Sequence, residues 1–285
     1  MRKIKKSIKE NKIPGIILKA SAMIIILYIL VCTALYFYQD KLIFWPQQLS
    51  DEARSISAVK KSGIEELELK MKDGTVIRGW FVKNNGNEKT NLLIYFGGNA
   101  EEVSRNLNQV SKFQNWSVAL FNYRGYGASE GTTGERTMFS DALEIYDYFS
   151  KREDIDRNNI AVWGRSIGTG VAAYLSSQRQ ASAVILTSPY DSLGSVVKEK
   201  MPFLPVGLVL KHRFDSIGRA PSIKSPLLII VGSEDTTIPA WHSRKLAERW
   251  GGKVSFQEII GEDHNSISKT DGYWNRVSDF LEKQQ

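Results

Sequence analysis

Short apolar runs alternate with amphipathic stretches over most of the chain. The apolar runs lie at 91–96, 117–121, 160–163, 183–187, 227–231 and 254–260, and the amphipathic stretches at about 101–114, 135–150, 167–178, 239–250 and 273–283. Near-continuous apolar runs separated by amphipathic helices are typical of parallel strands that are buried on both faces. The pattern therefore predicts an α/β fold.

Two more strands precede this series and form a predicted hairpin. Residues 64–71 alternate between apolar and polar positions, residues 75–82 are rich in β-forming side chains, and Asp73-Gly74 between them is a typical hairpin turn. We therefore predict a mostly parallel sheet of eight strands, with helices on both faces, within one domain that covers residues 61–285.

One stretch, at about 192–222, interrupts the alternation. It separates two predicted strands, contains Pro202 and Pro205, and carries a cluster of apolar residues around them. Long inserts in compact domains are often lids or binding loops. We expect a small lid-like insert here, and an ordinary crossover helix with irregular flanks is the alternative.

An uncharged apolar run of 19 residues, Ala20–Tyr38, precedes the domain. A helix of this length spans about 28 Å, which is close to the thickness of a bilayer core. Seven Lys and Arg against one Glu in residues 1–19 favour a cytoplasmic N-terminus. We expect a basic cytoplasmic tail (1–19), a transmembrane signal anchor (20–38), a juxtamembrane connector (39–60) and an extracytoplasmic domain.

A cleaved signal peptide and a buried core helix are the alternatives to an anchor. The apolar run continues past Ala34 without a clear Ala-x-Ala cleavage site, and it has no polar face. Both features favour the anchor over its alternatives.

The basic tail also accounts for most of the formal charge of +7, because residues 1–19 alone sum to +6. The nearly neutral remainder has no electrostatic reason to bind nucleic acid. The single Cys32 excludes an intramolecular disulfide and a Cys-rich zinc site. The chain shows neither the ligand spacing of a metal site nor a dinucleotide fingerprint, so we expect no metal and no cofactor.

The candidate nucleophile is Ser166. It is the centre of Gly164-Arg165-Ser166-Ile167-Gly168, a G-x-S-x-G motif that follows a predicted strand and precedes a predicted helix. In such a turn the serine has strained backbone angles, and the flanking glycines prevent steric clash. The alternative is a Gly/Ser turn without chemistry, but the strand–turn–helix context favours a nucleophile.

A serine needs a base to take its proton, and the chain has three histidines. His264 follows the last predicted strand, where catalytic groups of parallel sheets gather. His242 falls in a predicted helix and His212 in the insert, so we expect both at the surface. His264 is therefore the candidate base.

The candidate acid is Asp235, which follows the strand at 227–231. It gives the chain order Ser166, Asp235, His264, which is the order expected for this type of site. Glu234 and Asp191 are alternatives, whereas we expect Asp263 to lie at the surface.

Two backbone donors are needed to stabilise an oxyanion. One is expected from Ile167, which follows the nucleophile, and the other from the loop Gly97-Gly98-Asn99-Ala100 after the strand at 91–96. Gly98 and Asn99 are the candidates in this loop, and a plain glycine turn is the alternative.

These motifs together resemble the α/β-hydrolase fold and, within it, the membrane-anchored Bem46-like branch to which the human ABHD13 and ABHD17 proteins belong. The resemblance rests on 96–100, 122–131, 164–168, 214–216, 232–235 and 264–265 and covers most of 40–285. It implies Ser166 as nucleophile, Asp235 as acid and His264 as base, with the Gly98/Asn99 loop and Ile167 as oxyanion donors.

The chain departs from the family pattern at two positions. Gly97 replaces a usual histidine in the oxyanion loop, and Asn122 replaces a usual aspartate. Arg124 lies in the same motif as Asn122, and we expect it to brace the loop near the serine.

The sequence thus predicts a membrane-anchored serine hydrolase that cleaves an ester or thioester of a small or lipid-like acyl substrate. A non-catalytic binding or scaffold module on the same fold and a peptidase with the same triad are the alternatives.

Overall fold

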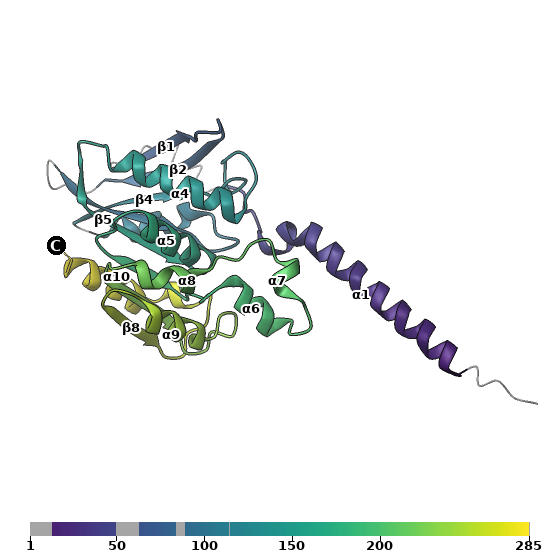
Figure 1. The fold of residues 1–285 in the computed structure, drawn as a ribbon. Helices are drawn as coiled ribbons and strands as arrows, with labels where there is room; N and C mark the ends of the chain where they lie inside the picture. Colours follow the sequence, from purple (N-terminus) through teal and green to yellow (C-terminus); the bar gives the residue numbers. More distant parts are fainter. Residues whose placement is uncertain (1–12, 50–62, 84–88, 114, 285) are drawn as a thin grey trace, which may run out of the picture.

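The computed structural model describes residues 13–49, 63–83, 89–113 and 115–284, and a long N-terminal helix projects from a layered body (Figure 1). Part of the predicted connector and the whole of residues 1–12 lie outside the described residues. The helix, α1, runs from Ile13 to Ile43. Its segment Ile17–Ile43 is long and apolar enough to cross a membrane.

The described residues of the body contain one sheet of eight strands, as predicted. The strand order is β1-β2-β4-β3-β5-β6-β7-β8. The β1–β2 and β2–β4 pairs are antiparallel and all the other pairs are parallel. The strands are β1 (Ile64–Lys70), β2 (Val76–Val82), β3 (Thr90–Phe96), β4 (Trp116–Phe121), β5 (Ile155–Arg165), β6 (Val184–Thr187), β7 (Leu227–Gly232) and β8 (Val254–Ile259).

Helices cover both faces of this sheet because its central strands are apolar on both sides. In β3, Leu92 and Ile94 belong to one core cluster, whereas Leu93 and Tyr95 belong to the other. The first face is covered by α4 (Glu135–Phe149), α5 (Ile167–Gln178) and α9 (Ala240–Arg249). The second is covered by η1 (Val103–Asn106), α3 (Leu107–Val110), η3 (Ile267–Lys269) and α10 (Asp271–Glu282).

The prediction of one long helix at 101–114 is wrong, because only the short η1 and α3 form there. The fully buried Glu102 accepts hydrogen bonds from the backbone N–H of Ser104 (3.2 Å) and from Asn122 (2.9 Å). Asn122 in turn accepts from the backbone N–H of Val103 at 3.1 Å. These side chains take the backbone donors of the first turn and make it irregular.

The insert at 192–222 folds into short helices rather than one crossover helix. These are α6 (Leu193–Lys200), α7 (Val206–Val209), α8 (Ser216–Arg219) and η2 (Ala220–Ser222). Figure 1 shows α6 and α7 beside the end of α1 that meets the body. There Asp40 pairs with His212 at 2.7 Å, and Phe44 is buried in the core of the first face. The end of α1 is thus packed onto the domain.

Candidate active site

Ser166 occupies a strained turn between β5 and α5. Its φ angle is +50°, in the left-handed region that non-glycine residues rarely adopt. A Cβ atom on Gly164 would lie 2.4 Å from the carbonyl oxygen of Gly168, and one on Gly168 would lie 2.2 Å from that of Phe96. Glycine is therefore required at both flanking positions for the turn to close.

The structure brings the three predicted side chains into one hydrogen-bonded chain. Nε2 of His264 lies 2.9 Å from Oγ of Ser166, and Nδ1 of His264 lies 2.8 Å from Oδ2 of Asp235. Asp235 follows β7 and His264 follows β8, so both come from loops at the carboxyl ends of parallel strands. His264 is 8% and Asp235 6% exposed, which screens their contact from water.

Asp235 is held in one orientation and in its charged form. Its other oxygen, Oδ1, accepts the backbone N–H groups of Thr237 (3.0 Å) and Ile238 (2.8 Å). Burial acts to raise the pKa of Asp235, but the hydrogen bond from His264 and the backbone donors outweigh it and lower that pKa. An ionised carboxylate therefore faces Nδ1 of His264.

The alternative residues considered for base and acid lie elsewhere. His242 was expected at the surface, but it is fully buried, with Nδ1 2.7 Å from Asp191 and Nε2 2.8 Å from Glu199. Asp191 thus partners a different histidine, and Glu234 is exposed. His212 contacts the end of α1, as described above.

The oxyanion loop differs from the expectation at one donor. The backbone N–H of Gly98 donates to Oε2 of Glu101 at 2.7 Å, so this N–H is engaged and the prediction for Gly98 is not met. Ile167 is the first residue of α5, where a helix leaves its N–H groups without intrahelical acceptors. The side chain of Asn99 turns away and bonds to the end of α1, with Nδ2 2.6 Å from the carbonyl oxygen of Ile43.

Two residues that the sequence analysis did not single out connect the loops of this site. Arg165 pairs with Glu101 at 3.0 Å and also donates to the carbonyl oxygen of His264 at 3.0 Å. Glu101 further accepts from Tyr95 (2.6 Å) and Asn106 (2.7 Å). Arg165 thus links the serine turn, the oxyanion loop and the histidine loop. Its place inside the G-x-S-x-G motif was the one available signal.

The two departures from the family pattern have local explanations. A Cβ on Gly97 would lie 3.0 Å from Val103 and 3.4 Å from Glu101, so these side chains fill the space that a larger residue would use. Asn122 donates to the buried Glu102, as noted above, whereas an aspartate there would place two carboxylates together. Arg124 donates two hydrogen bonds to Asp141 of α4, at 2.8 and 2.6 Å, and so ties its loop to that helix.

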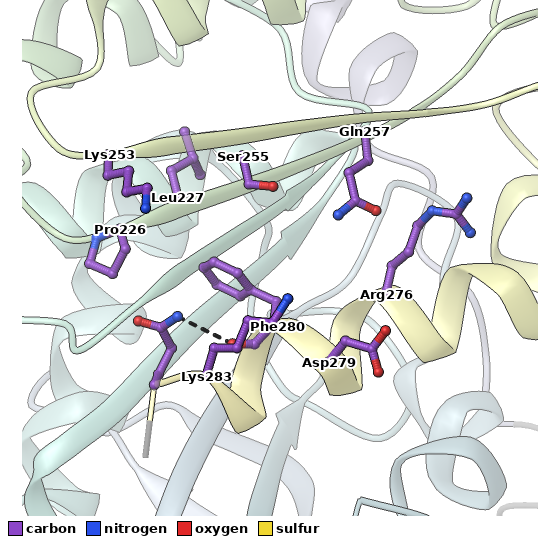
Figure 2. A pocket seen from close by; sticks show the side chains of 10 residues that line it. Pro226, Leu227, Lys253, Ser255, Gln257, Arg276, Asp279, Phe280 and Lys283 are labelled. Carbon is purple, nitrogen blue, oxygen red and sulfur yellow. Dashed lines mark hydrogen bonds between the residues drawn. The ribbon is translucent and has the colours of Figure 1, made fainter.

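A pocket lies away from Ser166, His264 and Asp235, between β7, β8 and the end of α10 (Figure 2). It has a volume of about 510 Å³ and is lined by Leu227, Lys253, Arg276 and Phe280, among others. Leu227 begins β7, whereas Asp235 follows the other end of that strand. The pocket therefore opens at the opposite edge of the sheet from Ser166. Among the described residues, no group of three or more His, Cys, Asp or Glu side chains could hold a metal ion.

The sheet order and the serine turn define the α/β-hydrolase fold, and comparison with known proteins agrees. A family model described as serine aminopeptidase, S33, matches residues 87–211. The chain is 30% identical to the human alpha/beta hydrolase domain-containing protein 17B over 248 residues, covering 84% of this chain and 83% of that one. It is 28% identical to the Saccharomyces cerevisiae membrane protein YNL320W, covering 87% and 90%.

Among solved structures, the Pyrococcus furiosus esterase Pf2001 superposes with a TM-score of 0.66 at 20% identity, covering 85% of this chain and 97% of the esterase. That likeness shows the shared fold. The chain belongs to the α/β-hydrolase family that includes the human protein 17B.

Proposed function

We propose that this protein is a membrane-anchored serine hydrolase that cleaves an acyl ester or thioester. The observation that carries the proposal is the hydrogen-bonded chain from Ser166 through His264 to Asp235, built on a strained turn at the edge of the sheet. In this geometry the histidine can take the proton of the serine hydroxyl, and the carboxylate stabilises the imidazolium that forms. Family membership supports the same chemistry.

In the proposed reaction, Oγ of Ser166 attacks the acyl carbonyl while Nε2 of His264 takes the serine proton. The tetrahedral intermediate collapses, and the departing alcohol or thiol receives that proton from His264. Water then attacks the acyl-serine, with His264 as base, and releases the carboxylic acid and free Ser166. Asp235 holds the Nδ1 proton and stabilises the imidazolium that forms twice in the cycle.

The oxyanion of each intermediate is stabilised by the backbone N–H groups of Ile167 and Asn99 in this proposal. The N-terminus of α5 adds its positive dipole end at the same place. Glu101 occupies the Gly98 N–H, and through Arg165 it holds the loop against the serine turn. In this proposal the hydrogen bond from Gly98 to Glu101 orients the loop, and the backbone N–H of Asn99 donates to the oxyanion.

We further propose that α1 anchors the domain on the extracytoplasmic side of a membrane. The apolar helix and the membrane-protein relative support anchoring, and the basic residues 1–19 favour a cytoplasmic N-terminus. Alkaline phosphatase fused after Gln285 is expected to be active, and a cytoplasmic readout contradicts this orientation.

Amide hydrolysis is the second candidate, and the description of the family model as serine aminopeptidase is what favours it. The same triad attacks esters and amides, and the two differ in the leaving group that His264 protonates. Side-by-side turnover of p-nitrophenyl acetate and aminoacyl p-nitroanilides distinguishes them. Faster anilide cleavage moves the proposal to a peptidase.

The central test is labelling of the detergent-solubilised full chain with a fluorophosphonate, which reacts with activated serines. We expect wild type to label at Ser166, and Ser166→Ala and His264→Ala to lose labelling. Ester turnover in both variants is expected to fall by about 10⁴-fold or more. Ser177→Ala, in the same helix that follows the nucleophile, is the matched control and keeps both signals. A folded wild type that does not label moves the proposal to a non-catalytic binding module.

A further inference from the structure

An apolar pocket lies between the end of α1 and the insert. Its volume is about 210 Å³, and its walls include Leu35, Leu42 and Ile43 of α1 and Val197, Leu204 and Leu210 of the insert. Drug-sized ligands occupy pockets of roughly 300–1,000 Å³, so a smaller ligand such as one linear chain suits this pocket.

Polar groups of the pocket wall are already bonded within the protein. Gln39 is the polar lining residue, and its amide nitrogen donates to the carbonyl oxygens of Tyr36 and Val209, both at 2.9 Å. Its amide oxygen accepts the backbone N–H of Lys211 at 2.8 Å. Because this amide is already hydrogen-bonded, the pocket presents an apolar wall, which favours a hydrocarbon ligand.

The insert reaches far along the membrane helix. The hydroxyl of Tyr28 donates to the carbonyl oxygen of Phe203 at 2.7 Å. Tyr28 precedes Ile43 by about 22 Å of helix, within the apolar segment of α1. A carbonyl group at membrane depth needs an internal donor because lipid offers none, and Tyr28 supplies one.

The surface of the insert has the composition of a membrane-embedded element. Residues 201–210 carry no charge, and the charged residues that flank them are Lys198, Glu199, Lys200, Lys211 and Arg213, of which four are cationic. Phe203 is 67% and Leu208 83% exposed although both are large and apolar. Apolar side chains beside a membrane helix, bordered by cationic ones, match the hydrocarbon and headgroup layers of one leaflet.

One residue of the pocket wall contacts a loop of the candidate active site. Ile43 lines the pocket, and its carbonyl oxygen accepts the 2.6 Å hydrogen bond from Asn99 described above. Asn99 follows Gly98, where a Cβ would lie 3.6 Å from that of Ser166. Hydrocarbon bound in the pocket is therefore adjacent to the loop that faces the nucleophile.

We propose that this pocket binds the hydrocarbon chain of the substrate's acyl group, which enters sideways from the bilayer. The inference rests on the proposed hydrolase function and adds the substrate class, an acyl donor dissolved in the membrane. In this arrangement α1 is a wall of the substrate site as well as an anchor.

The test uses the full chain in phospholipid nanodiscs and compares p-nitrophenyl decanoate with p-nitrophenyl acetate. Leu210→Trp fills the pocket, and Leu208→Trp, two residues away and facing outward, is the matched control. We expect Leu210→Trp to lower the decanoate-to-acetate ratio of kcat/KM at least about tenfold, because methylenes excluded from the pocket lose their burial. The control keeps the wild-type ratio. An unchanged ratio in Leu210→Trp, or an equal loss in Leu208→Trp, overturns the proposal.

A second measurement is independent of turnover and of the folding of a pocket variant. Ser166→Ala in nanodiscs is irradiated with a decanoic acid that carries a terminal diazirine, and the crosslinked peptides are mapped. Crosslinks within 35–43 and 197–210 support the pocket, and crosslinks confined to 17–34 overturn it. Pocket crosslinks together with a wild type that hydrolyses no acetate ester would refute the proposed function while supporting the pocket.

Discussion

Asp235 and its neighbour Glu234 offer a direct comparison of two carboxylates one residue apart. Asp235 is buried and bonded to His264, whereas Glu234 is exposed. We expect Asp235→Asn to lower kcat by about 10⁴-fold, because the amide no longer holds the Nδ1 proton of His264. Glu234→Gln is the control and keeps wild-type kcat. Ester turnover measures both, and a larger loss in Glu234→Gln contradicts the assignment of the acid.

At the same scale, the sequence is informative where a role depends on position along the chain. Ser166, Asp235 and His264 each follow an apolar run, and parallel strands bring such positions to one edge. Contacts between loops leave no such signal, so the engagement of the Gly98 N–H by Glu101 was not predicted. The role of Arg165 was not predicted either, because its partners lie in two other loops.

Among the elements, α6 of the insert is tied to α9 by a polar cluster in which His242 and Asp191 are buried, whereas Glu199 and Lys245 are partly exposed. Both ring nitrogens of His242 face carboxylates, Asp191 on one side and Glu199 of α6 on the other. Lys245 pairs with Asp191 at 2.7 Å. Burial acts to raise the pKa of Asp191, but the hydrogen bonds from His242 and Lys245 outweigh it and hold that pKa well below its ordinary value.

This cluster makes stability depend on pH in a defined direction. Because the folded-state pKa of Asp191 is lowered, its contribution is present above its unfolded pKa, about 3.9, and is lost as the pH falls toward the folded-state value. We expect Asp191→Asn to melt below wild type at pH 7 and the gap to narrow below about pH 4. Thermal unfolding followed by circular dichroism measures the gap. Asp147→Asn, which breaks a pair with Arg179 whose side chains are both 35% exposed, is the control with a smaller effect at pH 7. A gap for Asp191→Asn that widens in acid contradicts this account.

Prediction of the elements succeeded where hydrophobic periodicity decides the structure. The central strands are apolar on both faces, and α4, α5, α9 and α10 carry apolar stripes that the sheet buries. The prediction of a long helix at 101–114 was wrong because buried polar side chains bind backbone groups there, and hydrophobic periodicity does not reveal such contacts. The prediction that His242 lies at the surface was wrong for a related reason, because α6, which is distant in the chain, covers this side chain.

At the scale of the whole molecule, the apolar helix α1 and the α/β-hydrolase domain form one connected structure. Ile43 bonds to Asn99 of the oxyanion loop, the backbone N–H of Trp45 donates to the same side chain at 3.0 Å, and Asp40 pairs with His212. An anchor that served only to hold the domain at a membrane would need none of these contacts. Their position predicts that the end of α1 contributes to turnover even when no membrane is present.

Two truncated chains in detergent separate anchoring from this contribution. One starts at Leu35 and keeps every α1 residue that contacts the oxyanion loop, and the other starts at Phe44 and keeps the buried phenylalanine that belongs to the core. We expect the chain from Leu35 to hydrolyse p-nitrophenyl acetate like the full protein. The chain from Phe44 is expected to be slower by roughly tenfold or more, because Asn99 loses its acceptor at Ile43 and a loosened loop misplaces its donor. Melting temperatures of the two chains show whether both are folded. Equal turnover by two folded chains would mean that α1 is only an anchor.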